Sequence, residues 1–172
     1  MPDVIGLDLS LTSTGVAHGD TTVSFQPKTK GMQRLEDLTL EILGVVLSYP
    51  DPFVVVEGYS FSSRNSHAHA LGELGGVARH ALWVRRIAYV DVPPTCRAKF
   101  ATGKGNAGKA EVVSSVSART GRTWTGKGAE DECDAWVLQE MGLHHFGAAR
   151  HEWPATNVAA LSTIEWPLWS TL

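Results

Sequence analysis

The spacing of apolar residues changes twice in the first third of the chain. Residues 4–9 form an apolar run that contains Asp8, and two further short runs, residues 14–18 and 21–25, flank Gly19-Asp20. Short apolar runs on either side of a glycine-containing turn are typical of a β-hairpin. The pattern therefore predicts three antiparallel strands at the start of the chain.

A helical period and then a continuous apolar run follow these strands. Apolar residues recur at three- and four-residue spacing over residues 31–48, typical of an amphipathic helix that Pro50 and Pro52 end. Residues 53–56 are the uninterrupted run Phe-Val-Val-Val, typical of a strand buried on both faces. We therefore expect a helix and then a fourth strand that ends at Glu57.

The second half of the chain predicts one more strand among several helices. In chain order, we expect a helix over residues 66–86, a strand over 87–92, a short helix after Pro93-Pro94, and helices over 109–118 and 129–145. This succession of strands and helices predicts an α/β fold with a mixed five-stranded sheet flanked by helices.

Residues 150–172 follow no clear period. Trp153, Trp166 and Trp169 lie in this segment, and several tryptophans are costly to leave in water. We therefore expect one domain over residues 1–149, followed by a Trp-rich tail over residues 150–172 that packs on the domain or on a partner.

Composition bears on the cellular setting. No apolar run approaches the roughly 20 residues that a membrane span needs, and the first residues lack the build of a signal peptide. Cys96 and Cys133 lie far apart and form no CxxC motif, as expected of free thiols in a reducing compartment. We expect a cytoplasmic protein that does not contact a membrane.

Charge is unevenly distributed along the chain. The formal net charge is −3, yet residues 60–130 carry eleven Lys and Arg residues against four acidic ones. A basic middle between acidic ends is expected of a site that binds phosphates locally, although a basic stretch can equally be a solvated helix face.

Four carboxylates stand out because of their positions. Asp8 and Glu57 each end an apolar strand, and Asp131 and Asp134 share one face of an expected helix. Ala135 keeps that face slim, so that a strand can lie close to it. Taken singly, a strand-end acid caps a turn or pairs with arginine, and first-turn acids suit the helix dipole.

Together, the four acids predict an oxygen-rich metal site. Carboxylate oxygens suit Mg²⁺ or Mn²⁺ better than zinc, and a cation keeps converging buried carboxylates ionised. Two such ions are able to activate water on one side of a phosphodiester and to stabilise the leaving oxygen on the other. We therefore expect Mg²⁺, replaceable by Mn²⁺, with two ions per site.

Basic residues near glycines are the candidates for phosphate contacts. Lys99, Lys104 and Lys109 flank a glycine-containing segment that is not a Walker A loop. Arg79, on the helix before it, either positions a phosphate or lies on a solvated face.

In their order over residues 4–145, these features resemble the RuvC-type Holliday junction resolvases. Residues 5–10 (IGLDLS) with Thr14-Gly15 are similar to that family's opening "IGIDPG…TG" strand and turn, and Val56-Glu57 is similar to its second catalytic strand. The other matching segments are Phe61…Asn65 with residues 70–79 (ALGELGGVAR), residues 94–109 (PTCRAKFATGKGNAGK), and Asp131-x-x-Asp134-Ala135.

The resemblance implies an RNase H-like nuclease domain over residues 1–149. It implies a homodimer that makes paired incisions in a four-way DNA junction, in the cytoplasm of a bacterium or a phage-infected host. By position, the metal ligands are Asp8, Glu57, Asp131 and Asp134, and Lys109 contacts the scissile phosphate. The expected DNA contacts are Tyr59, Phe61, Arg64, Arg79, Lys99, Lys104 and Lys109, with Tyr59 and Phe61 straddling the place of the family's junction-probing aromatic.

Three departures accompany the resemblance. The family's Asp-Pro-Gly is Asp8-Leu9-Ser10 here, the chain is less basic, and the tail has no counterpart, which together suit a phage-type member. The alternatives are a relative that acts on flaps, forks or RNA, a protein that binds branched DNA without cutting it, and a nucleotide-binding domain of the actin and sugar-kinase type.

Overall fold

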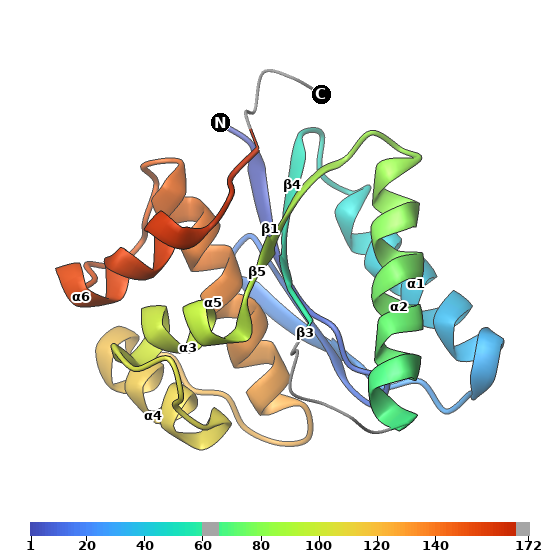
Figure 1. Cartoon of the computed structure of the whole chain (residues 1–172), viewed down its shortest axis with the longest axis horizontal. Helices are drawn as coiled ribbons and strands as arrows, with labels where there is room; N and C mark the ends of the chain where they lie inside the picture. Colours follow the sequence, from blue (N-terminus) through green and yellow to red (C-terminus); the bar gives the residue numbers. More distant parts are fainter. Residues whose placement is uncertain (60–65, 168–172) are drawn as a thin grey trace.

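A five-stranded mixed sheet forms the centre of the molecule (Figure 1). The computed structural model describes residues 1–59 and 66–167, with only the backbone for residues 66–68 and 70. The strands are β1 (Asp3–Asp8), β2 (Thr14–His18), β3 (Thr21–Phe25), β4 (Pro52–Glu57) and β5 (Ala88–Val92). Their order is β3-β2-β1-β4-β5. The pairs β1–β2 and β2–β3 are antiparallel, and β1–β4 and β4–β5 are parallel. The predicted meander and mixed sheet are confirmed.

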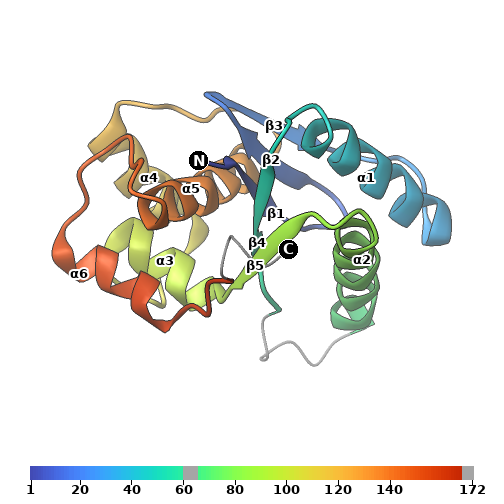
Figure 2. The same cartoon turned by 90° about the horizontal axis from the view of Figure 1, so that it is seen from above.

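Helices cover both faces of this sheet (Figure 2). One face carries α1 (Gly31–Val46) and α2 (Ser66–Trp83). The other carries α3 (Pro94–Thr102), α4 (Lys109–Thr120), α5 (Ala129–His145), α6 (Ala155–Val158) and the 3₁₀ helix η1 (Ala159–Thr163). The α/β class with helices on both sides of the sheet is therefore confirmed.

One helix boundary differs from the prediction. The helix expected to reach residue 86 ends at Trp83, and Arg86 adopts a left-handed backbone with φ 57°. The backbone N–H groups of Arg85 and Arg86 donate to the carbonyl oxygens of Leu82 and Trp83, which turns the chain into β5. Arg85 and Arg86 therefore lie in a turn, not on the helix.

The alternation of side chains along β1 and β4 separates two cores. Ile5, Leu7, Val54 and Val56 pack toward α1 and α2. On the other face, side chains of the strands pack with α3, α4 and α5 to form the second core. The residues that β1, β4 and β5 contribute to it are Val4, Phe53, Val55, Ala88, Val90 and Val92. Because side chains alternate, Asp8 and Glu57 fall on this second face, the face that α5 covers.

Helix α5 rests directly on the sheet because glycines lie beneath it. A Cβ added at Gly6 of β1 would overlap the carbonyl oxygen of Ala135 and lie 2.6 Å from the amide nitrogen of Gln139. A Cβ added to Gly142 of α5 would lie 2.6 Å from Cγ1 of Val4. The slim face expected at Ala135 is therefore matched by an equally slim strand, which lets backbone approach backbone.

The described part of the Trp-rich segment packs against α3 and α5. Trp153 is buried with its ring centroid 4.5 Å from that of Phe100, and the Asn157 amide donates to the Phe100 carbonyl at 2.7 Å. Trp166 stacks on His145 with centroids 4.1 Å apart. Trp169 lies outside the described residues. None of the described helices is long and apolar enough to cross a membrane.

Candidate active site

Asp8 and Glu57 lie side by side at the carboxyl ends of two adjacent parallel strands. In the β1–β4 register Leu7 pairs with Val56, and each acid is the next residue along its strand. Both acids fall on the α5 face, where the Asp8 side chain is 9% exposed and that of Glu57 is 17% exposed. Parallel pairing therefore joins two acids that are 49 positions apart in the sequence.

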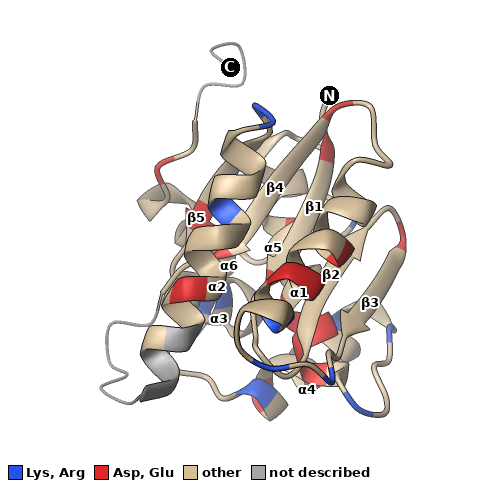
Figure 3. Cartoon of the chain, turned by 90° about the vertical axis from the view of Figure 1, so that its right-hand side faces the viewer, with Lys and Arg blue, Asp and Glu red and all other residues tan. Residues whose placement is uncertain are grey.

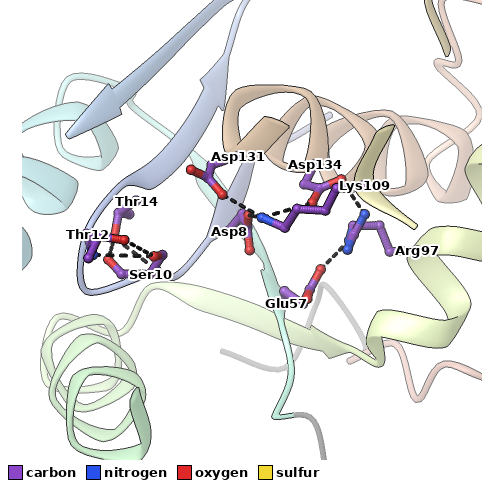
Figure 4. Close-up of polar contacts among 9 residues, drawn as sticks. All are labelled: Asp8, Ser10, Thr12, Thr14, Glu57, Arg97, Lys109, Asp131 and Asp134. Carbon is purple, nitrogen blue, oxygen red and sulfur yellow. Dashed lines mark hydrogen bonds and ion pairs between the residues drawn. The ribbon is translucent and has the colours of Figure 1, made fainter. Parts of the chain in front are cut away.

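The first turns of α5 supply the other two acids. Gly15 pairs with Asp8 in the β1–β2 register, and a Cβ on Gly15 would overlap the carbonyl oxygen of Asp131. This close approach puts the helical turn that bears Asp131 and Asp134 directly beside Asp8 (Figure 4). The structure thus brings together all four predicted metal ligands.

Lys109 is the first residue of α4 and reaches three of these acids. Its Nζ donates to Asp131 Oδ1 at 2.6 Å, and lies 3.6 Å from Asp134 Oδ2 and 3.8 Å from Asp8 Oδ2. The Lys109 side chain is 44% exposed, so the ammonium group borders both the acids and solvent. This predicted phosphate contact therefore lies in the acidic cluster.

Arg97 of α3 is a site residue that the sequence prediction missed. Its Nε donates to Glu57 Oε2 and its Nη1 donates to Asp134 Oδ1, and the residue is 7% exposed (Figure 4). A signal was available: Arg97 recurs with Phe100 and Ala101 at the three- and four-residue spacing of a buried helix face. A charged residue on such a face needs a buried partner of opposite charge.

The acids and cations shift one another's protonation. Burial, with the nearby Glu57 and Asp134 carboxylates, raises the pKa of Asp8 well above its ordinary value. Burial also raises the pKa of Asp134 to about 6, although Arg97 and Lys109 oppose that rise. Burial alone would lower the pKa of Lys109, but the surrounding carboxylates outweigh it and raise that pKa. Burial is therefore the main reason why Asp8 and Asp134 hold a proton more tightly than they would in water.

Two carboxylate oxygens in this cluster lack a hydrogen-bond donor. Asp8 Oδ2 and Asp134 Oδ2 are buried, and neither accepts a hydrogen bond within the described residues. The ion-pair distances from Lys109 to these atoms, 3.8 and 3.6 Å, exceed hydrogen-bond length. Buried acceptors without donors are costly, so this donor set fits a hard cation such as Mg²⁺ or Mn²⁺.

The acids are not already arranged as a coordination shell. Within residues 1–59 and 66–167, no group of three or more histidine, cysteine, aspartate or glutamate side chains is spaced to hold a metal ion. In this arrangement the carboxylates pair with Arg97 and Lys109 instead. Metal binding would therefore require small movements of the carboxylates and of Lys109.

The turn after Asp8 is held by threonine. The Ser10 amide donates to Thr14 Oγ1 at 3.2 Å, and that hydroxyl donates to the Ser10 carbonyl at 2.6 Å (Figure 4). These reciprocal bonds fix the turn in which the resemblance places Pro-Gly. The departure at Leu9-Ser10 therefore has a local structural replacement.

The predicted DNA contacts fall in different environments. Arg79 donates to Asp91 Oδ1 and to the Glu57 carbonyl, and its guanidinium lies 4.7 Å from the ring centroid of Tyr59. Tyr59 is 43% exposed and, with Arg79, lines a small pocket that also touches Asp8 and Glu57. The guanidinium of Arg79 is thus engaged inside the protein, whereas the ring of Tyr59 borders the acids.

The lysines on the α3 side are more accessible. Lys99 is half-buried on α3, and Lys104 is 68% exposed and pairs with Glu111 at 3.1 Å. Phe61 and Arg64, the other two predicted DNA contacts, lie outside the described residues. The exposed end of Lys104, between α3 and α4, and the partly exposed ammonium group of Lys109 are therefore accessible from solvent.

The order of the strands, with α5 packed across the sheet, defines an RNase H-like α/β fold. A mixed sheet in the order β3-β2-β1-β4-β5 presents two acids at the ends of β1 and β4, and α5 adds two more.

Within that class, the chain has the fold of the RuvC-type resolvases. It is similar to Thermus thermophilus RuvC in complex with a Holliday junction substrate, with a TM-score of 0.64 and 20% sequence identity over 88% of this chain and 100% of that one. A second structure of Thermus thermophilus RuvC gives a TM-score of 0.62 and 20% identity, over 87% of this chain and 99% of that one. Searches of protein-family models and of curated proteins find no match.

Proposed function

We propose that this chain is a divalent-metal-dependent DNA endonuclease that cleaves four-way junctions as a homodimer. The observation that carries the proposal is the meeting of Asp8, Glu57, Asp131 and Asp134, with two buried oxygens that lack donors. A protein that only binds DNA gains nothing from carboxylates that face phosphates. The likeness to a RuvC structure that contains a Holliday junction substrate supports branched DNA as the substrate.

The charge distribution supports DNA approach along the α3–α4 side. Residues 94–109 carry four basic residues and no acidic one. By contrast, α1 carries Glu36, Asp37 and Glu41 against Arg34 alone, and these acids lie on the far side of the sheet (Figure 3). A phosphate backbone is therefore attracted to the face that bears the acidic cluster.

The residues of the cluster have distinct tasks in this proposal. Asp8 and Asp134 hold the cation with Asp131 beside it, and Lys109, at the solvent boundary, binds a non-bridging oxygen of the scissile phosphate. Arg97, from its buried position on α3, holds Glu57 and Asp134 in place through its two ion pairs. The bound cation supplies charge neutralisation and an activated water. The geometry thus separates substrate binding, by Lys109, from positioning of the acids, by Arg97.

Two features of the surface support the other parts of the proposal. Tyr59 borders the acids and is exposed, so that a splayed base at the junction centre can stack on it, for roughly 1–3 kcal/mol per base. Val77, Trp83 and Val84 are exposed at α2 and just after it, and supply apolar surface for a symmetric partner.

The decisive test is cleavage of a synthetic four-way junction in Mg²⁺, with a fork, a flap and a linear duplex of matched sequence as competitors. We expect paired nicks in the junction, none in EDTA, and loss of cleavage but not of junction binding for Asp8→Asn. Lys28→Met, a change at an exposed residue between β3 and α1 that pairs with none of the four acids in the described structure, is the matched control. A wild-type protein that binds junctions but does not nick them in Mg²⁺ or Mn²⁺ would exclude the nuclease.

A further inference from the structure

Arg97 is a permanent positive charge inside the acidic cluster. Only 7% of the residue is exposed, and its guanidinium pairs with Glu57 Oε2 on one side and Asp134 Oδ1 on the other. Arginine stays protonated at any working pH, and Arg97 is buried on α3 together with Ala98, Phe100 and Ala101. Moving the guanidinium out of the site would break both of its ion pairs.

The pairing divides the carboxylate oxygens into two groups. Glu57 Oε2 and one oxygen of Asp134 are taken by the guanidinium. Asp8 Oδ2 and the other oxygen of Asp134, Oδ2, are buried and lack a donor. Of these buried oxygens, the second group is the one that a cation can bind without breaking the Arg97 ion pairs, and breaking a buried ion pair is costly.

The charge of the site leads to the same result. In the DNA-free protein, the four acids carry four negative charges when ionised, and Arg97 and Lys109 offset two of them. One divalent ion neutralises the remainder. A second ion would leave an excess positive charge in a partly buried site, which is unfavourable. The expectation of two ions, drawn from the donor set alone, did not include Arg97.

We propose that Arg97 takes the place of a second divalent cation, so that the DNA-free site binds one ion through Asp8 and Asp134. The inference rests on the proposed metal-dependent nuclease and specifies the composition of its site. Arg97 is then a positioning residue that neutralises Glu57 permanently. Glu57 borders the ion's site without being one of its main ligands.

The test is a count of Mn²⁺ ions bound per chain in the absence of DNA, by electron paramagnetic resonance with calorimetric titration. We expect one ion for the wild type. We expect Asp8→Asn and Asp134→Asn to weaken its binding by at least about tenfold. Glu57→Gln should weaken it less than either. Lys28→Met, which removes an exposed positive charge that pairs with none of the four acids in the described structure, should leave the count at one.

Substitution of Arg97 tests the replacement directly. Arg97→Gln keeps hydrogen-bonding capacity but removes the charge, and should raise the count from one to two, whereas Arg97→Lys should keep it at one. Circular dichroism checks that each variant is folded. If Arg97→Gln does not fold, the wild-type count still decides, because two ions or none would overturn the proposal.

The metal count and the junction assay test the two proposals independently. A wild-type count of two with junction cleavage intact removes the role assigned to Arg97 and leaves the nuclease standing. A count of one in a protein that never cleaves DNA keeps the single-ion site and removes the nuclease.

Discussion

Gly15 of β2 lies directly against the backbone of Asp131 in α5. A Cβ at Gly15 would overlap the Asp131 carbonyl oxygen and lie 2.5 Å from its carbonyl carbon. Gly15 also pairs with Asp8 across the β1–β2 ladder. The absence of a side chain at this position therefore sets the distance between the first acid of the sheet and the acids of the helix.

Gly15→Ala should consequently damage both the site and the fold. The added methyl group has backbone atoms as neighbours, which cannot rotate away, so α5 must lift from β2. We expect a loss of about 1–3 kcal/mol in the free energy of unfolding, together with weaker Mn²⁺ binding. Urea denaturation and metal titration measure the two effects.

Gly44→Ala is the matched control for this change. Gly44 lies on the exposed side of α1 with nothing within 4 Å of an added Cβ. Alanine there should stabilise the protein by about 0.5–1 kcal/mol, because glycine is the poorer helix former. Equal effects of the two substitutions would contradict the close approach of α5.

The metal-free protein should lose stability as the pH rises through the pKa of Asp134. Burial raises the pKa of Asp134 to about 6 from 3.8, so the folded state binds the proton more tightly than the unfolded chain does. The stabilisation is complete below about pH 4 and disappears as the pH rises through 6, a change of up to about 3 kcal/mol. The raised pKa of Asp8 acts in the same direction.

Urea unfolding in EDTA between pH 4 and 7.5 measures this dependence. Asp134→Asn should flatten the curve, because asparagine has no proton to release. Saturating Mn²⁺ should favour the ionised acid and raise stability at the upper end of the range. Identical slopes for wild type and Asp134→Asn would show that Asp134 titrates normally.

Arg150 should stabilise the fold through its pairing with a fully buried acid. Its Nε donates to Glu140 Oε2 at 2.9 Å, and Glu140 is 0% exposed. Arg150→Met leaves the Glu140 charge buried with its strongest partner removed, which should cost about 3–5 kcal/mol. The double variant with Glu140→Met should cost less than the sum of the single changes, and a double-mutant cycle in urea tests this.

Lys104 and Arg79 should differ in their effect on DNA binding. Lys104 is largely exposed, and its ion pair with Glu111 is a weak surface pair that a phosphate can replace, so Lys104→Met should weaken junction binding and reduce its salt dependence by about one counterion. Arg79 is paired with Asp91 and covers Tyr59, so Arg79→Met should lower stability and leave the salt dependence unchanged. Junction binding measured at several salt concentrations distinguishes the two roles. A smaller salt dependence for Arg79→Met and an unchanged one for Lys104→Met would make Arg79 the phosphate contact instead.

Local sequence patterns predict the acids of the site well. Asp8 and Glu57 stand out because a charged residue ends an apolar strand, and Asp131 and Asp134 stand out by their helical spacing. The convergence of Asp8 and Glu57 follows from the parallel pairing of β1 with β4, and the two acids of α5 join them because α5 packs closely on Gly6 and Gly15. The spacing of apolar residues in strands and helices therefore predicts most of the fold. It also identifies the four acids of the cluster, although not Lys109.

The partners of the basic residues are harder to predict, because they depend on tertiary contacts. Arg97 was counted only as part of a basic stretch, and its burial depends on α3 packing between α4 and α5. The sequence left Arg79 as a phosphate contact or a solvated side chain, and its pairing with Asp91 of β5 could not be predicted from local spacing. The tail lacked a period because α6 has only four residues and a 3₁₀ helix follows it.

The glycine-lined contact between α5 and the sheet fixes the acids more firmly than the outer surface. Backbone packed on backbone leaves the acids little freedom to shift independently. Helix α2 and the surface lysines lie outside this contact. In the nuclease proposed above, substitutions there would change which DNA shape is bound without moving the acids.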